Sequence, residues 1–229
     1  MAEEYGRLQT RRVTKDVHRL VPSRFPPVSL FDSARNADEL AMLAELEGLT
    51  NERLREQLGE IHRVPKEDAI YGPGTTPIMA AFCHPAPSRF TDGSFGIYYA
   101  GLEVETAIAE TRYHRERFLR SAGITEEVLE MRCYTTSVCE AMSLLPRRQA
   151  TALLDPDSYA QSQRFGRWLR DHQAWGIYYA SVRNPPEGRC VAVLRARALR
   201  PVQQTSHYRY FWNGQSIHQI ERYERMEVR

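Results

Sequence analysis

The sequence is most constrained between Ser88 and Thr111, because signals for a turn, a strand and a helix follow one another there without interruption. The segment opens among turn-forming residues, bounded by Pro87 and by Asp92-Gly93. An apolar run at 95–100 predicts a short strand. Beyond Gly101, apolar residues recur at helical spacing and predict a helix. A unit of this kind can bring side chains from all three elements to one cleft.

Three polar side chains lie along this unit: Arg89 in the turn, Tyr99 in the strand and Glu110 in the helix. An arginine can hold a phosphate or a sugar hydroxyl through its planar fork of donors. A tyrosine offers a flat face to a flat ring, and a hydroxyl besides. A carboxylate beside a sugar can bond a ribose hydroxyl and stabilise positive charge that grows on the anomeric carbon. Together the three residue types predict a site that cleaves an N-glycosidic bond in a nucleotide.

These residues also follow the spacing of a known family. Tyr99 lies ten residues after Arg89, in Y-Y-A-G, and Glu110 lies eleven residues after Tyr99, in T-A-I-A-E. A later serine, Ser181, lies in G-I-Y-Y-A-S-V-R-N. With these four residues in order, the chain resembles the RES domain, the toxin half of bacterial RES–Xre toxin–antitoxin pairs, over about residues 70–200. Many RES domains begin with an x-R-L strand that V-H-R-L resembles, which makes Arg19 a second candidate for substrate binding.

The resemblance implies a fold similar to that of ADP-ribosyltransferases, and NAD+ as a substrate cleaved between nicotinamide and its ribose. In this scheme Glu110 stabilises the charged ribose, and Tyr99 stacks on nicotinamide. Arg89 anchors the diphosphate or a ribose hydroxyl, and Ser181 bonds the substrate or holds Glu110. The acceptor is water, inorganic phosphate as a co-substrate, or a macromolecule, and no metal or further cofactor is implied. The implied protein partner is an Xre-type antitoxin with a helix-turn-helix.

Each of these residues also has an interpretation without a catalytic role. Arg89 could pair with Asp92 in its own loop, and Tyr99 could be a core residue at a sheet edge. Glu110 could be an exposed acid of its helix. His84, close in sequence to Arg89, is a further candidate for the site, although a lone histidine is more commonly structural or solvated.

Two other functions stay open from the sequence. The first is an ADP-ribosyltransferase that uses the same residues to modify a protein or a nucleic acid. The second is a non-catalytic interaction module that binds through a helical hairpin at 36–61 and an aromatic tail at 208–212. The second function predicts no turnover and tolerance of changes at Glu110.

Composition predicts a soluble, cytoplasmic protein. The 229 residues carry a net charge of +2, so no global excess of charge points to direct binding of nucleic acid or of a membrane. No apolar run approaches the length of a membrane span. The four cysteines form no C-x-x-C pair, which favours reduced thiols in a core over a metal site or a disulfide framework.

The remaining pattern predicts a single domain over 1–229, with an N-terminal helical extension at about 34–62. Two amphipathic helices, at 36–49 and 51–61, form the predicted hairpin. Strands outnumber long helices and do not alternate with them, which indicates an α+β fold with a curved, mostly antiparallel sheet and packed helices. Further strands are predicted at 17–21, 76–83, 127–138, 175–181 and 189–197, a helix at 159–172, and a closing hairpin around Asn213-Gly214.

Overall fold

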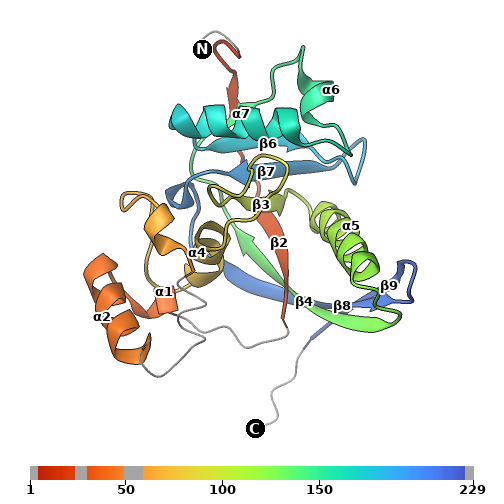
Figure 1. Ribbon diagram of the computed structural model, residues 1–229, viewed down its shortest axis with the longest axis horizontal. Coiled ribbons are helices and arrows are strands. Elements are labelled where there is room, and N and C mark those ends of the chain that lie inside the picture. Colours follow the sequence, from red (N-terminus) through yellow and green to blue (C-terminus); the bar gives the residue numbers. More distant parts are fainter. Residues whose placement is uncertain (1–4, 24–29, 49–58, 225–229) are drawn as a thin grey trace.

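The protein is built on one open sheet whose strands are almost all antiparallel. The computed structural model describes residues 5–23, 30–48 and 59–224. Within these ranges nine strands pair in the order β1-β5-β6-β7-β3-β2-β4-β8-β9, and β5–β6 is their one parallel pair (Figure 1). The strands are β1 (Thr10–Arg11), β2 (Val17–Pro22), β3 (Tyr98–Gly101), β4 (Glu127–Thr136), β5 (Met142–Leu144), β6 (Gly176–Ala180), β7 (Arg189–Val193), β8 (Gln203–Trp212) and β9 (Ile217–Tyr223). The α+β class and the mostly antiparallel sheet are thereby confirmed.

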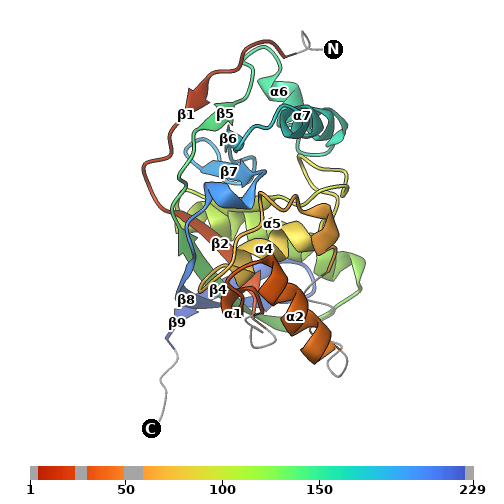
Figure 2. The ribbon, with the colours of Figure 1, turned by 90° about the vertical axis from the view of Figure 1, so that its left-hand side faces the viewer.

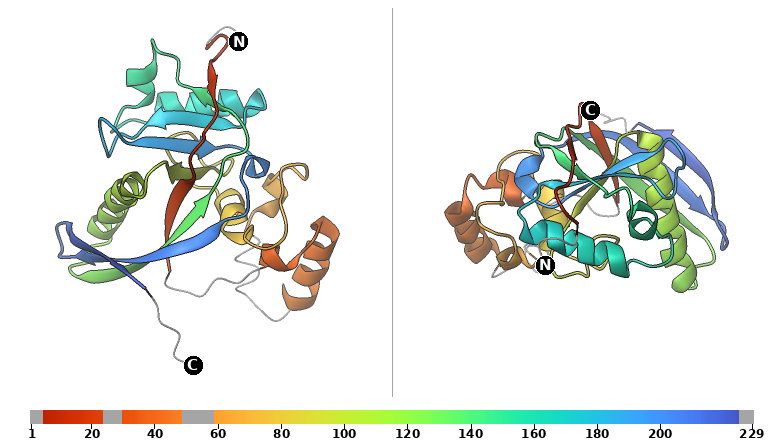
Figure 3. Two further views of the ribbon diagram at one scale, coloured as in Figure 1. Left: turned by 180° about the vertical axis from the view of Figure 1, so that it is seen from behind. Right: turned by 90° about the horizontal axis from the view of Figure 1, so that it is seen from above.

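Helices cover this sheet from more than one side. Seen from behind, α5 lies on one side of β2 and β4, and α4 lies on the other side with α1 and α2 (Figure 3). Figure 2 shows α7 beside β6 and β7 at the opposite end of the molecule from β8 and β9. The helices are α1 (Leu30–Ser33), α2 (Ala37–Gly48), α4 (Thr76–Cys83), α5 (Val104–Ser121), α6 (Ala150–Leu153) and α7 (Ala160–Asp171), with 3-10 turns η1 (Ile61–Arg63) and η2 (Ala196–Ala198). None of the helices in the described ranges is long and apolar enough to cross a membrane.

Three apolar clusters hold the helices to the sheet, one each beneath α4, α7 and α5. Because successive residues of a strand face opposite sides of the sheet, β2 contributes side chains to two of these clusters. Val17 packs in the α4 cluster and Leu20 in the α5 cluster. Burial of each large apolar side chain contributes about 1.5–3 kcal/mol. Buried members of the three clusters are, in turn, Ile78 and Tyr98, Phe165 and Ile177, and Leu119 and Trp212.

The sheet opens between β2 and β3. β2 pairs with β4 along its whole length, from Val17 to Pro22. With β3, in contrast, the described chain makes one pair, His18 with Gly101. β3 pairs over its whole length with β7 instead. Beyond His18 the two strands therefore diverge, and their facing backbone groups need partners other than each other.

One predicted strand is wrong. Residues 76–83, T-P-I-M-A-A-F-C, form the helix α4. Pro77 lies in its first turn, where the missing N–H of proline costs no helical hydrogen bond. A continuous apolar run does not distinguish a buried strand from a buried helix. Packing against the core favours the helix here, since its residues Ile78, Met79 and Phe82 are all buried.

The N-terminal helical extension is described in part. The predicted helix at 36–49 is confirmed by α2. Of the second predicted helix, at 51–61, residues 51–58 lie outside the described residues. The chain is not α-helical where that helix was predicted to end, because 61–63 form the 3-10 turn η1.

The repeated motif G-I-Y-Y-A lies on both sides of β7, with its two copies offset by two residues along that strand. β3 carries Tyr99 and pairs it with Ala192, whereas β6 carries Tyr179 and pairs it with Cys190. Ala192 and Cys190 are two residues apart on β7, so the two tyrosines project from the same face of the sheet. The repeat thus places two phenol side chains near one another from strands far apart in the sequence.

Helix α7 approaches the turn at 88–91 very closely, and a glycine permits this approach. Gly166 is buried in the middle of α7, and a Cβ built on it would overlap the carbonyl oxygen of Phe90. Gln163, on the same helix, donates from Nε2 to the carbonyl oxygen of Ser88 at 3.0 Å. The helix therefore supports the backbone on both sides of Arg89.

We expect Gly166→Ala to destabilise the protein by about 1–3 kcal/mol, as overpacking against a fixed backbone usually does. Helix propensity alone predicts the opposite sign, because alanine is favoured over glycine by about 1 kcal/mol in a helix. The free energy of unfolding from urea titration measures the change. Gln161→Ala, at an exposed position of α7, is the matched control and should differ little from the parent protein. A Gly166→Ala protein as stable as the parent would refute the close approach.

Candidate active site

The gap between β2 and β3 opens into a cavity of about 290 Å³, which we call the Glu110 cavity. β2 and β3 border it on one side and α5 on the other, and the turn that carries Arg89 closes one end. Glu110, Arg89, Tyr99 and Arg19 all line it, so the structure brings together four residues singled out from the sequence. The other described residues of the lining are His18, Leu20, Ser88, Ala100, Gly101, Ala107, Thr111, His114, Arg115, Tyr159, Tyr179 and Cys190.

Glu110 is held by the fifth candidate residue. Ser181, just beyond β6 and 3% exposed, donates from Oγ to Glu110 Oε1 at 2.7 Å. Glu110 is only partly buried and borders the cavity, so it is not the fully exposed helix acid considered as an alternative. Cys190 Sγ lies 3.9 Å from the same carboxylate oxygen. The carboxylate is therefore fixed on one side and open to the cavity.

The direction of the Ser181 hydroxyl is set by the backbone. The amides of Arg183 and Asn184 donate to Ser181 Oγ at 3.1 and 3.0 Å. Since these two bonds use the oxygen as acceptor, the single hydroxyl proton is left for Glu110. Asn184 also ties this turn to α5, by donating from Nδ2 to Thr106 Oγ1 at 3.0 Å. Ser181 thus matches the role of holding Glu110, and no histidine among the described residues bonds its hydroxyl as the base of a serine nucleophile would.

Tyr99 fixes the turn before it in sequence. Its hydroxyl lies 2.9 Å from Ser88 Oγ and accepts from the backbone amide of Phe90 at 3.1 Å. Both partners flank Arg89 directly. Burial raises the pKa of Tyr99 to about 12, although these hydrogen bonds act in the opposite direction. Tyr99 is therefore a neutral phenol that positions the arginine turn while its ring lines the cavity.

Arg89 is buried, at 9% exposed, and its two close contacts are with a carbonyl oxygen and an aromatic ring, while the Asp155 carboxylate interacts with its charge from further away. Its Nη1 donates to the carbonyl oxygen of Asp155 at 2.8 Å, and its guanidinium carbon lies 4.6 Å from the centre of the Tyr159 ring. It does not pair with Asp92, which instead accepts from Arg167 Nη2 at 2.6 Å. The loop ion pair considered for Arg89 is therefore wrong, and its guanidinium borders the cavity.

Arg19 lies where β2 leaves β3. Its Nη1 donates to the carbonyl oxygen of Tyr99 at 3.1 Å, so a side chain takes the place of a strand–strand hydrogen bond. Its guanidinium carbon lies 4.8 Å from the centre of the Tyr98 ring, and its buried Nε has no partner among the described residues. Burial lowers the pKa of Arg19, because the charged form is desolvated. A partly buried cation with spare donors is suited to an anion.

The cavity combines an excess of positive charge with neutral buried groups. Three arginines line it, and Glu110 is its one carboxylate among the described residues. Burial raises the pKa of Cys190 and of Tyr179, and the neighbouring Glu110 acts in the same direction on both. Both groups are therefore protonated at neutral pH, and the Cys190 thiol is a poor nucleophile.

Several lining residues were not anticipated from the sequence. Tyr179 could have been found, because it repeats the position of Tyr99 in the second G-I-Y-Y-A motif. No comparable signal marks Tyr159, which precedes α7 and reaches the cavity only through folding. Arg115 and His114 continue the face of α5 that carries Glu110, one turn further on. His84 does not line the Glu110 cavity; it lies at a second cavity.

Comparison with known proteins agrees with the sequence resemblance. The chain is 30% identical over 207 residues to the uncharacterized protein y4oC of Sinorhizobium fredii (strain NBRC 101917 / NGR234), covering 90% of this chain and 86% of that protein. A chain in the crystal structure of the M. tuberculosis MbcT–MbcA toxin–antitoxin complex is 10% identical, with a TM-score of 0.42 over 86% of this chain and 85% of that chain. The sequence model of the RES domain matches residues 60–213, which include Arg89, Tyr99, Glu110 and Ser181. The chain therefore belongs to the RES domain family.

Proposed function

We propose that the protein is the toxin of a toxin–antitoxin pair and that it cleaves the bond between nicotinamide and ribose in NAD+. The observation that carries the proposal is a carboxylate, Glu110, oriented by Ser181 in a cavity that also presents Arg89, Arg19 and Tyr99. A fixed carboxylate is what stabilises positive charge on a sugar ring. The two arginines match the negative diphosphate of a dinucleotide.

The bond that breaks has a good leaving group. Nicotinamide is already cationic in NAD+, so it takes the electron pair of the C–N bond, departs as a neutral molecule and needs no general acid. The barrier lies in the positive charge left on the ribose. Glu110 stabilises that charge through its free oxygen, while Ser181 holds the other. An oxygen of water or of inorganic phosphate then bonds the anomeric carbon, and with water the surplus proton passes to solvent.

The other residues orient the substrate. Arg89 binds the diphosphate or a ribose hydroxyl through donors that its contact with Asp155 leaves free. The ring of Tyr99 packs against nicotinamide, and its hydroxyl keeps the turn with Arg89 in place. Tyr179 contributes a second aromatic wall from β6. Holding the ribose over Glu110 in one pose supplies much of the rate advantage of such a site.

Membership of the RES domain family supports the proposed role as the toxin of a toxin–antitoxin pair. An enzyme that depletes NAD+ in the cytoplasm has to be restrained, and the family resemblance implies an Xre-type antitoxin with a helix-turn-helix as the partner. NAD+ acts here as a substrate, with inorganic phosphate as a candidate co-substrate and no further cofactor.

Product analysis of NAD+ turnover tests the proposal directly. Protein freed of any antitoxin is incubated with NAD+, with and without inorganic phosphate, and products are resolved by chromatography. Free nicotinamide with ADP-ribose identifies a glycohydrolase, and ADP-ribose 1″-phosphate identifies phosphorolysis. Transfer of ADP-ribose to an added protein or nucleic acid would instead identify a transferase. Folded protein that releases no nicotinamide under any of these conditions would exclude NAD+ cleavage.

Replacing the carboxylate should remove most of the activity. We expect Glu110→Gln to lower kcat for nicotinamide release about 100-fold or more, as loss of one preorganised electrostatic group commonly does. KM should change little, because the amide still fills the same space. Glu105→Gln, at an exposed position of the same helix, is the control and should keep full activity. Near-full activity of a folded Glu110→Gln protein would refute the assigned role.

Removing the hydroxyl that holds the carboxylate should have a smaller effect of the same kind. Ser181→Ala takes away a hydrogen bond to a charged group, and such a bond contributes about 1.5–3 kcal/mol. If about half of this is expressed in the transition state, kcat falls about tenfold. The double variant Ser181→Ala/Glu110→Gln should be no slower than Glu110→Gln alone, because Ser181 acts through Glu110. Additive losses in the kinetic cycle would show an independent role for Ser181.

A further inference from the structure

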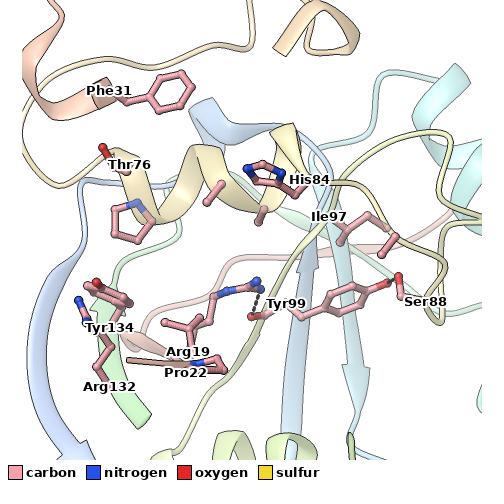
Figure 4. Close-up of a pocket in the computed structure, with 15 residues that line it drawn as sticks. Arg19, Pro22, Phe31, Thr76, His84, Ser88, Ile97, Tyr99, Arg132 and Tyr134 are labelled. Carbon is pink, nitrogen blue, oxygen red and sulfur yellow. Dashed lines mark hydrogen bonds between the residues drawn. The ribbon is translucent and has the colours of Figure 1, made fainter. Parts of the chain in front are cut away.

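A second cavity, which we call the Arg132 cavity, lies on the other face of β2. Its volume is about 470 Å³. Val21 lines it, whereas Leu20 lines the Glu110 cavity, and neighbouring residues of a strand face opposite sides of the sheet. Figure 4 shows α4 above this cavity and the strand residues Arg19, Arg132 and Tyr134 on the opposite side.

The two cavities meet where β2 and β3 diverge. Arg19, Ser88 and Tyr99 border both of them. In Figure 4, Arg19 contacts the backbone of Tyr99, while the Tyr99 ring extends towards Ser88. The border that the two cavities share therefore lies where no ladder of β2–β3 hydrogen bonds separates them.

The lining of the Arg132 cavity has the character of a nucleotide site. Two guanidinium groups, of Arg19 and Arg132, border it, and its described lining contains no carboxylate. Arg132 is 7% exposed and donates from Nη2 to the carbonyl oxygen of Ser23 at 3.3 Å, which fixes its position. Tyr134 adds an aromatic side chain, and apolar residues complete the walls, with the core residue Phe31 behind them at 1% exposed. Cationic groups beside aromatic and apolar surface suit a ligand with a phosphate and a flat ring.

Size indicates how a dinucleotide divides between the cavities. Ligand sites for drug-sized molecules are commonly about 300–1,000 Å³, and the Glu110 cavity lies at the lower limit. A cavity of this volume is small for a whole dinucleotide. The Arg132 cavity is the larger of the two and begins at Arg19, one of the arginines assigned to the diphosphate.

We propose that the Arg132 cavity binds the adenosine monophosphate half of NAD+. Arg19 contacts the diphosphate between the two cavities, Arg132 supplies a second cation, and Tyr134 contacts the adenosine. This assignment rests on the proposed NAD+ cleavage, which it extends to the part of the substrate remote from the scissile bond. Binding there stabilises the bound substrate and the transition state alike, and so lowers KM without changing kcat.

Binding of AMP, measured by NMR saturation transfer and by calorimetry, tests the cavity without reference to catalysis. The parent protein and Glu110→Gln should both bind AMP, because Glu110 lies in the other cavity. Ala80→Leu adds volume from α4 to the Arg132 cavity and should weaken AMP binding about tenfold or more. Ala122→Leu, at an exposed position after α5, is the matched control and should bind AMP as the parent does. Arg132→Met, which removes one cation, gives a second independent variant.

The kinetics of the same variants distinguish the contribution of the adenosine monophosphate half of NAD+ from that of the nicotinamide half. Ala80→Leu and Arg132→Met should raise KM for NAD+ about tenfold and leave kcat within about twofold. Nicotinamide release from nicotinamide mononucleotide, which lacks the adenosine monophosphate half, should be the same in both variants as in the parent. A fold defect would reduce the turnover of both substrates together.

Failure of this proposal can be told apart from failure of the proposed function. AMP binding that is absent, that is unchanged by Ala80→Leu, or that inorganic phosphate matches in affinity would overturn the nucleotide site, even if NAD+ is cleaved. Loss of AMP binding in Ala80→Leu alone, from a protein that releases no nicotinamide, would leave the nucleotide site in place and overturn the proposed cleavage.

Discussion

One residue pair, His18 with Gly101, joins β2 to β3 in the described chain, and the backbone beyond it has to be satisfied in another way. Arg19 meets part of this need by donating to the carbonyl oxygen of Tyr99. The side chain thus takes the place of a ladder bond, and cavities lie on both sides of it. A fully paired β2–β3 ladder would be more regular, but it would close the space in which the candidate active site lies.

The polar groups of this site are held mainly by backbone atoms. Tyr99 accepts from the amide of Phe90, Arg89 donates to the carbonyl of Asp155, and Ser181 accepts from two consecutive amides. A backbone partner cannot rotate away as a surface side chain can, so the fold itself fixes these groups in position. Such preorganisation is what allows a few charges to act strongly in a partly buried cavity.

The sequence predicted which residues come together better than it predicted the shape of the cavity that they line. The spacing of sequence motifs was enough to identify four site residues: Arg89, Tyr99, Glu110 and Ser181. Helix α5 could be predicted because its apolar residues recur with a regular helical period. The apolar run 76–83 carries no such period, and only packing against the core shows that it is a helix. The Arg132 cavity could not be predicted from the sequence, because it depends on how far β2 and β3 separate and not on any local sequence pattern.

Ser181 Oγ closes the turn after β6 and orients the carboxylate of Glu110 at the same time. A change at Ser181 therefore disturbs both tasks, whereas a change at Glu110 leaves the bonds of the turn in place. A descendant that kept the fold and abandoned the chemistry would lose Glu110 first, because the turn does not depend on it. Among relatives of this protein, a serine retained opposite a replaced glutamate would accordingly mark a chain that has become a pure binding partner.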